Sequence, residues 1–168
     1  PQEPCRSGMR GADAYVQRRA DATSLQAQGR ALGLKVSFMV LCELKDFAAL
    51  QQATRRPGVA VMVPWQTLFD SHQQALVDVL TRARVPAIFP RHQYVQAGGL
   101  LSLEPVTEAI PDRSSLLALT QVLNGHSPSQ LPVHTPRGFS LHVNAGAAHR
   151  TGQHPSLLVL RRADVVMQ

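Results

Sequence analysis

Charged and aromatic residues are scarce in this chain. Of its 168 residues, 17% are charged and 5% are aromatic, whereas 44% are apolar. This composition is typical of a soluble globular protein, and the length suits one domain, or most of one, with its own buried core. No apolar run approaches the roughly 20 residues that a membrane span needs, so the sequence predicts no membrane insertion.

Cysteine and lysine are also few. Two cysteines do not make a disulfide framework. The 15 arginines outnumber the 2 lysines, and the net charge is +6. The arginine pairs at 18–19, 55–56 and 161–162 lie far apart, with too few aromatic residues to interleave with them as stacking platforms. We therefore interpret the charge as solvated surface and expect no nucleic-acid partner.

The chain begins with proline, and no charged-then-apolar leader follows. We expect either that a signal peptide has been removed or that the chain is a fragment. Residues 1–11 carry proline, glycine and serine without a hydrophobic period, which predicts a disordered tail or remnant. The folded domain is expected to span residues 12–168.

Helical and strand patterns alternate along the first half of the chain. Helical spacing covers residues 13–32, 44–55 and 67–84, and strand-like apolar runs cover 34–40, 59–63 and 85–89. Strands that are apolar on both faces and joined by helices predict an α/β fold with a mostly parallel sheet flanked by helices. The later chain predicts strands at 100–103 and 139–143 and helices at 112–123, 145–150 and 155–166.

Ligands of such a sheet bind beyond the carboxyl ends of its strands. Arg91, His92 and Gln93 follow the third strand there, and an arginine suits a carboxylate. Trp65 follows the second strand and forms either the wall of a binding site or a plug over the sheet edge. The predicted ligand-binding residues are Trp65, Gln66, Thr67, Arg91, His92, Gln93, Gly98, Gly99, Ser102 and Glu104.

Part of this set has an equally simple structural interpretation. The pair Gly98–Gly99 permits a close backbone approach to a ligand, or belongs to an ordinary strand–turn–strand. Ser102 and Glu104 either hydrogen-bond a ligand or serve as polar groups at the end of a strand. Both alternatives stay open from the residues alone.

Motifs of catalysis and cofactor binding are absent from the sequence. It contains no GxSxG elbow, no Walker-type phosphate loop and no zinc-ligand spacing among its seven histidines. We therefore expect no enzyme activity, no metal and no cofactor.

The late segment from Val122 to Ala148, VLNGHSPSQLPVHTPRGFSLHVNAGAA, resembles the substrate-binding proteins of ABC transporters, of the type that includes tryptophan and tyrosine binders. Matching family positions are Leu123, Gly125, Pro128, Leu131, Pro132, Val133, Pro136, Phe139, Leu141 and Asn144. The stretches at 95–102 and 162–164 are similar to two further family motifs. The resemblance covers about residues 20–167.

This resemblance implies the carboxy-terminal lobe and return segments of a type I periplasmic binding protein. It implies an incomplete domain, lacking the amino-terminal lobe and the opening strand of the second lobe. It also implies a periplasmic or extracytoplasmic location, a small solute such as an amino acid, and a membrane permease as partner. A ligand-sensing or interaction domain of the same fold, without a transport partner, is the alternative.

Two departures from the family bear on the solute. Amino-acid binders of the family tend to place an aspartate in the loop that here reads Pro64–Thr67, where no acid is present. The family's Ser-Tyr-Gly reads Ser102-Leu103-Glu104 in this chain, so Glu104 is a candidate to replace the missing acid.

Overall fold

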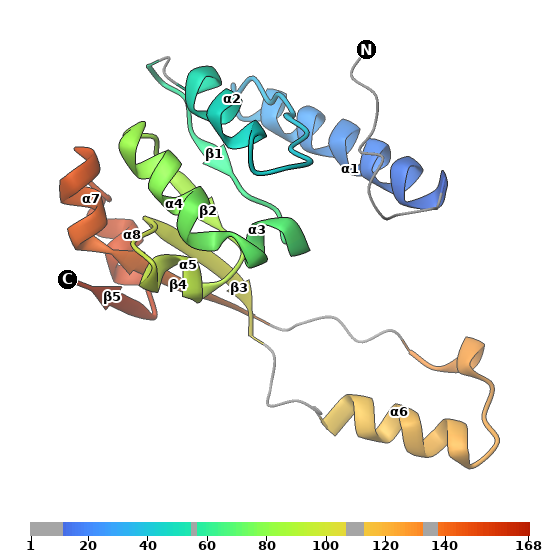
Figure 1. Cartoon of the computed structure of the whole chain (residues 1–168). Helices are drawn as coiled ribbons and strands as arrows, with labels where there is room; N and C mark the ends of the chain where they lie inside the picture. The colour runs from blue at the N-terminus through green and yellow to red at the C-terminus, as the bar shows by residue number, and fades with distance from the viewer. Residues whose placement is uncertain (1–11, 55–56, 107–112, 133–137) are drawn as a thin grey trace. The chain divides into compact units, whose positions relative to one another are not determined.

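The computed structural model describes residues 12–54, 57–106, 113–132 and 138–168 (Figure 1). The expected tail, residues 1–11, lies outside these ranges. The chain divides into two compact units, residues 1–53 and 54–168. The first contains helices α1 (Ala12–Ala31) and α2 (Asp46–Ala53). The Oδ2 atom of Asp46, the first residue of α2, accepts hydrogen bonds from the backbone N–H groups of Cys42, at 2.8 Å, and Glu43, at 2.9 Å, and so ties the preceding turn to the helix.

The second unit is built on a five-stranded sheet in the order β1-β2-β3-β4-β5. Strands β1, β2 and β3 are parallel, β4 is antiparallel to β3, and β5 is parallel to β4. The strands are β1 (Val61–Met62), β2 (Ala87–Phe89), β3 (Leu101–Pro105), β4 (Phe139–Asn144) and β5 (Val165–Met167). The mostly parallel sheet with flanking helices confirms the predicted fold class.

The helices of this unit follow the strands along the chain. They are α3 (Thr67–Ser71), α4 (Gln73–Arg82), α5 (His92–Gln96), α6 (Arg113–Leu123), the 3₁₀ turn η1 (Pro128–Gln130), α7 (Ala145–Thr151) and α8 (Leu157–Arg162). Helix α5 packs on β3 and β4, and α4 packs against α5 and α7. The core between these elements is mostly apolar and contains the buried side chains Leu76, Val77, Leu80, Phe89, Tyr94, Val95 and Val143.

One polar side chain fixes α5 on the sheet. Asn144, at the end of β4, donates from its amide nitrogen to the carbonyl of Val95 at 3.1 Å. Its amide oxygen accepts from the backbone N–H of Ala147 at 2.7 Å and so begins α7. Because Asn144 is buried, both halves of its amide need these partners.

The expected strand at residues 34–40 is wrong, since that segment belongs to no strand of the described structure. Leu34, Phe38 and Val40 are exposed by 51–59%. A strand forms only where a neighbour completes its backbone hydrogen bonds, and β1 has β2 as its only neighbour in the described sheet. The described residues therefore contain no partner strand for this segment.

Two further expectations needed correction. The helix predicted over 67–84 is broken at His72, whose φ of −127° is not helical. The predicted closing helix ends at Arg162, and β5 follows it. Asp164 causes this change, because its backbone N–H donates to the Leu141 carbonyl at 2.8 Å while its carboxylate accepts from the Leu141 N–H at 2.8 Å.

The ends of α4 and α5 share one backbone motif with different residues at its key position. At the end of α5, Gly98 has φ +104° and its N–H donates to Val95, while the next N–H donates to Tyr94. At the end of α4, Arg84 has φ +54° and its N–H donates to Thr81, while the N–H of Val85 donates to Leu80. Left-handed backbone suits glycine and strains a side chain, so Arg84 holds a position where glycine fits better.

Replacing Arg84 with glycine should therefore stabilise the protein by about 1 kcal/mol, because the left-handed conformation costs a non-glycine residue about that much. Urea unfolding of the Arg84→Gly variant and the wild type measures the difference. A Gly98→Ala variant is the opposite control and should lose stability. An Arg84→Gly variant less stable than the wild type would contradict this account of the α4 end.

Gly99 has a separate role, close packing. A Cβ atom at Gly99 would lie 2.7 Å from both the Phe89 ring and the Tyr94 carbonyl oxygen. The Phe89 and Tyr94 rings stack with centroids 5.0 Å apart. The missing side chain therefore lets β3 begin directly beneath α5.

Gly99→Ala should destabilise the chain by about 1–3 kcal/mol, the usual cost of overpacking a core. Gly138→Ala is the matched control, because its nearest neighbour to an added Cβ is 3.9 Å away. Thermal unfolding of both variants tests the difference. Equal losses in the two would show that the contact with Phe89 and Tyr94 is not what demands glycine.

Candidate functional site

The parallel strands place the predicted residues of two loops at one edge of the sheet. Trp65 follows β1, and Arg91 follows β2, which is parallel to β1. Helix α3 links the two, because Asp70 on α3 contacts both Arg91 and Tyr94. The carboxyl ends of β1 and β2 therefore lie together, as the sequence analysis expected.

Asp70 is the hub of this link. Its Oδ1 atom accepts a hydrogen bond from the Tyr94 hydroxyl at 2.7 Å, and its Oδ2 atom lies 3.4 Å from Arg91 Nη1. Burial raises the pKa of the Tyr94 phenol above its ordinary value, and the hydrogen bond and charge of Asp70 raise it further. Tyr94 thus stays a neutral donor, fully buried, that holds α5 against α3.

A second acid, Glu104, fixes His92. The two oxygens of Glu104 lie 2.8 Å from the His92 backbone nitrogen and 2.8 Å from its Nδ1 atom. Burial alone would raise the pKa of Glu104, but the His92 hydrogen bonds and the nearby charges of His92 and His142 outweigh it and hold that pKa below its usual range. Glu104 is therefore an ionised anchor for the imidazole.

Strand β4 adds the side chains of His142 and Ser140 to this cluster. His142 lies directly opposite Ser102, and Ser140 opposite Glu104. The His142 ring stacks on the His92 ring, with centroids 5.4 Å apart, and its Nε2 atom lies 3.0 Å from Ser140 Oγ. Because residues two apart share a sheet face, these side chains and Glu104 all project toward α5.

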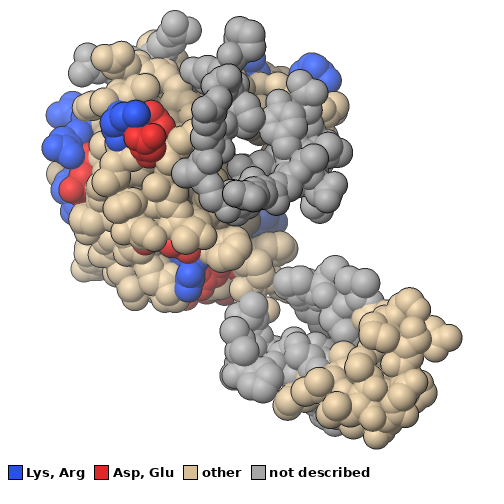
Figure 2. Space-filling view, turned by 45° about the vertical axis from the view of Figure 1, so that its right-hand side comes forward, with Lys and Arg blue, Asp and Glu red and all other residues tan. Residues whose placement is uncertain are grey.

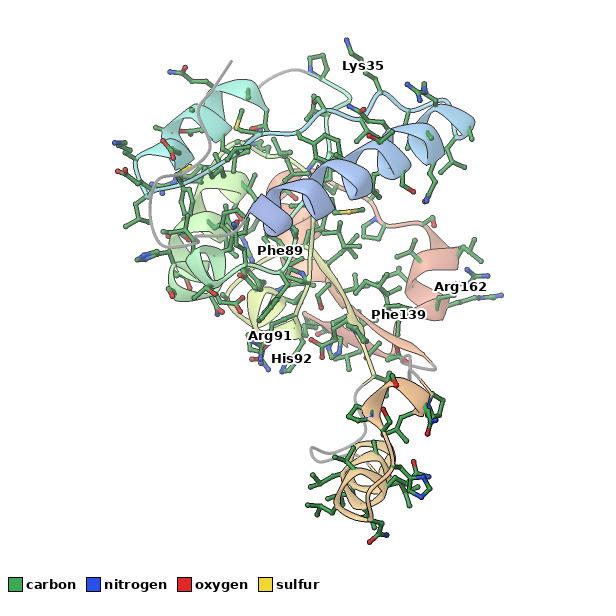
Figure 3. All side chains as sticks on the ribbon, turned by 90° about the vertical axis from the view of Figure 1, so that its right-hand side faces the viewer. Lys35, Phe89, Arg91, His92, Phe139 and Arg162 are labelled. Atoms are coloured by element: carbon green, nitrogen blue, oxygen red, sulfur yellow. The ribbon has the colours of Figure 1, made fainter. Side chains whose placement is uncertain are left out.

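The structure brings some of the predicted residues together and separates others. Arg91, His92 and Glu104 cluster at the carboxyl edge, and Figure 3 shows Arg91 and His92 side by side. Trp65 is 68% exposed beside Gln66 and Thr67, where α3 begins.

The other predicted residues lie deeper or at the opposite end of β3. Ser102 is fully buried, and its hydroxyl has no hydrogen-bond partner in the described structure. The side-chain oxygen of Gln93 is likewise buried without a described partner. Gly98 and Gly99 precede β3, so they lie at its amino end, away from Glu104. The structure does not bring these glycines to the Arg91 cluster.

Sequence reasoning missed three members of the cluster: Asp70, Tyr94 and His142. Asp70 and Tyr94 are 24 residues apart, and only the packing of α3 against α5 brings them together. One signal was available, since Asp70 is an acid in the first turn of the helix after β1. The position of His142 depends on the register between β3 and β4, which the sequence did not supply.

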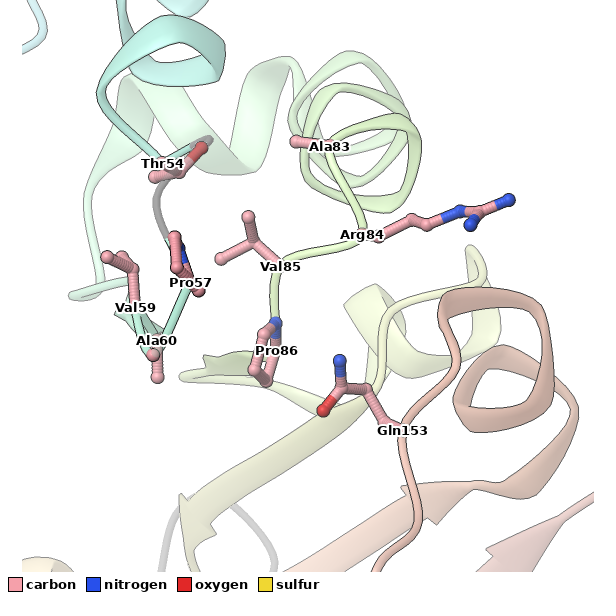
Figure 4. Close-up of a pocket in the computed structure, with 10 residues that line it drawn as sticks. Thr54, Pro57, Val59, Ala60, Ala83, Arg84, Val85, Pro86 and Gln153 are labelled. Carbon is pink, nitrogen blue, oxygen red and sulfur yellow. The ribbon is translucent and has the colours of Figure 1, made fainter.

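A cavity of about 530 Å³ lies at the opposite, amino-terminal ends of β1 and β2 (Figure 4). Its lining includes Pro57, Val59, Val85, Pro86 and Gln153. None of the predicted site residues lines it. This position argues against the cavity as the solute-binding site, because ligands of parallel sheets bind at the carboxyl ends of the strands.

No group of three or more His, Cys, Asp or Glu side chains in the described residues could hold a metal ion. None of their helices has the length and apolar character required to cross a bilayer.

Residues 15–167 match the family model described as ABC transporter substrate binding protein. The chain belongs to this family. No curated protein matches it.

Three solved structures share the fold. A conserved domain protein of Vibrio cholerae has a TM-score of 0.72 at 19% identity, covering 89% of this chain and 50% of that one. An ABC domain from Streptococcus pneumoniae in complex with L-Trp has a TM-score of 0.68 at 21% identity, covering 89% and 52%. The ligand-free, open structure of an adhesive substrate-binding protein from Clostridium difficile has a TM-score of 0.63 at 20% identity, covering 95% and 52%. The chain thus spans about half the length of each.

The depressed pKa of Glu104 predicts an acid-dependent loss of stability. Because the folded protein holds Glu104 ionised, this contribution is complete above the ordinary pKa of about 4.3 and is lost as the pH falls through the lower folded value. Glu104→Gln should therefore destabilise the chain most at pH 7, and the difference from wild type should shrink below about pH 4. Urea unfolding at a series of pH values measures it; a difference independent of pH would contradict the stabilisation of ionised Glu104 by its hydrogen bonds to His92.

Proposed function

We propose that this chain is the solute-binding part of an ABC transporter, working outside the cytoplasm with a membrane permease as its partner. The solute is a small organic molecule such as an amino acid. The observation that carries the proposal is the joining of the loops after β1 and β2 through Asp70. This contact forms a polar wall at the carboxyl edge of the sheet, where such folds bind ligands.

The comparisons support this proposal in two ways. The family is defined by substrate binding, and one structural neighbour is described in complex with L-Trp. The groups in the wall suit a small polar solute: they are a guanidinium, an imidazole pair and an exposed tryptophan. On its own it covers one side of a solute, so we expect weak binding in comparison with an enclosed pocket.

The charge distribution favours a solute over nucleic acid. On the face drawn in Figure 2, basic side chains are scattered among tan surface, and several lie beside acidic ones. Nucleic-acid binding needs a basic patch or stripe that tracks the phosphates. The proposed wall instead contains two acids, Asp70 and Glu104, close to its single arginine.

Fluorescence of Trp65 tests this proposal, because it is the only tryptophan in the chain. Titration with non-fluorescent amino acids, among them leucine and valine, should give a saturable emission change at millimolar solute. Calorimetry covers tryptophan and tyrosine. Trp65→Phe is the control and should abolish the emission change without unfolding the chain. A folded chain that responds to no amino acid or small organic acid would contradict the proposal.

A further inference from the structure

Hydrogen-bonding capacity at the carboxyl edge is unevenly used. Both acids are engaged by short bonds: Asp70 accepts from the Tyr94 hydroxyl at 2.7 Å, and Glu104 has two contacts of 2.8 Å to His92. Among the described residues, Arg91 makes one long contact, of 3.4 Å, to Asp70. A guanidinium has five N–H donors, so most of the hydrogen-bonding capacity of Arg91 is unused in the described structure.

The exposure of Arg91 and the contacts of its neighbours explain why it forms no tight ion pair. Its side chain is 46% exposed, whereas that of Asp70 is 25% exposed. Asp70 is held by its shorter bond to the buried Tyr94, so its position is set by the core and not by the arginine. Both oxygens of Glu104 are engaged by His92, and the described residues show no contact between Glu104 and the guanidinium. The arginine is thus oriented but not neutralised in a tight pair.

We propose that Arg91 receives a carboxylate of the solute and that Asp70 is the residue that positions Arg91. This inference rests on the proposed function. A guanidinium pairs with a carboxylate through two parallel N–H···O bonds, which are stronger than neutral hydrogen bonds. One long bond to Asp70 leaves this paired geometry available. Arg91 therefore selects solutes with a carboxylate over otherwise identical ones without it.

The acids around Arg91 narrow the class of solute. Asp70 lies beside Arg91 and Glu104 beside His92, and the repulsion of these acids is twice as strong for a phosphate dianion as for a singly charged carboxylate. A singly charged carboxylate is accepted, and an ammonium group on the same molecule would lie near the acids. These charges fit an α-amino acid in its zwitterionic form.

Three related solutes test the inference with the 168-residue chain: L-tryptophan, L-tryptophanamide, which lacks the carboxylate, and 3-indolepropionate, which lacks the amine. Binding is followed by shifts of backbone and Arg Nε–H signals in ¹⁵N NMR spectra up to millimolar solute. Tryptophan should bind at least tenfold more tightly than its amide, because charged hydrogen bonds carry that much discrimination. The Arg91 Nε–H signal should move with tryptophan and 3-indolepropionate but not with the amide.

Variants separate the roles of the two residues. Arg91→Lys should weaken tryptophan and 3-indolepropionate about tenfold and leave the amide unchanged, since lysine cannot form the paired bonds. Asp70→Asn should reduce the preference for tryptophan over its amide while the Arg91 Nε–H signal broadens or shifts before any solute is added. Arg82→Lys is the matched control, because Arg82 is exposed on α4 and contacts only Asp78 in the described structure.

The outcomes keep this inference distinct from the proposed function. Equal binding of tryptophan and its amide, unchanged in Arg91→Lys, would overturn the role of Arg91 and leave solute binding standing. If the folded chain bound none of the three solutes and no other amino acid, the proposed function itself would be overturned.

Discussion

The contact of Asp70 with Tyr94 and Arg91 is the interaction on which the candidate site depends. Parallel strands bring their carboxyl ends to one edge, but the loops that follow them need a further constraint to form a wall. Asp70 supplies it from α3, because its bond to the Tyr94 hydroxyl reaches the buried side of α5. Without this acceptor, a buried phenol would lack a partner and the loop after β2 would lose its anchor.

A similar logic recurs on the other side of α5. Glu104 bonds the first residue of the helix, His92, through both its backbone and its ring. Asn144 bonds the carbonyl of Val95 near the end of the same helix. A five-residue helix has little stability of its own, so its place is set by Asp70, Glu104 and Asn144, which come from α3, β3 and β4. The candidate site is therefore held by the core and not by its exposed loop residues.

Hydrophobic periodicity predicted the order of most helices and strands, because that order depends on local spacing. It missed α5, which is too short to show a period, and this omission explains the interpretation of Gly98 and Gly99. Once α5 is present, Gly98 ends it and Gly99 packs beneath it. Periodicity also assigned a strand to residues 34–40, although a strand requires a partner that no local pattern can supply.

In the candidate site, too, some residues were predictable from the sequence and others were not. Arg91, His92 and Glu104 were predictable, because polar residues at strand ends stand out in the sequence. Their partners Asp70 and His142 were not, since each contact depends on the packing of α3 or on the register of β4. Ser102 was assigned to the site from its position in the strand alone, and its complete burial became visible only in the fold.

Mapping backbone amide shifts on addition of L-tryptophan tests the central claim most directly. The sheet offers two places for a solute: the carboxyl edge around Arg91 and the cavity at the amino ends lined by Val85 and Gln153. Our account predicts that shifts concentrate from Trp65 to Asp70, at Arg91 and His92, and at Glu104. Shifts confined to the cavity around Val85 and Gln153, with none at Arg91, would contradict it.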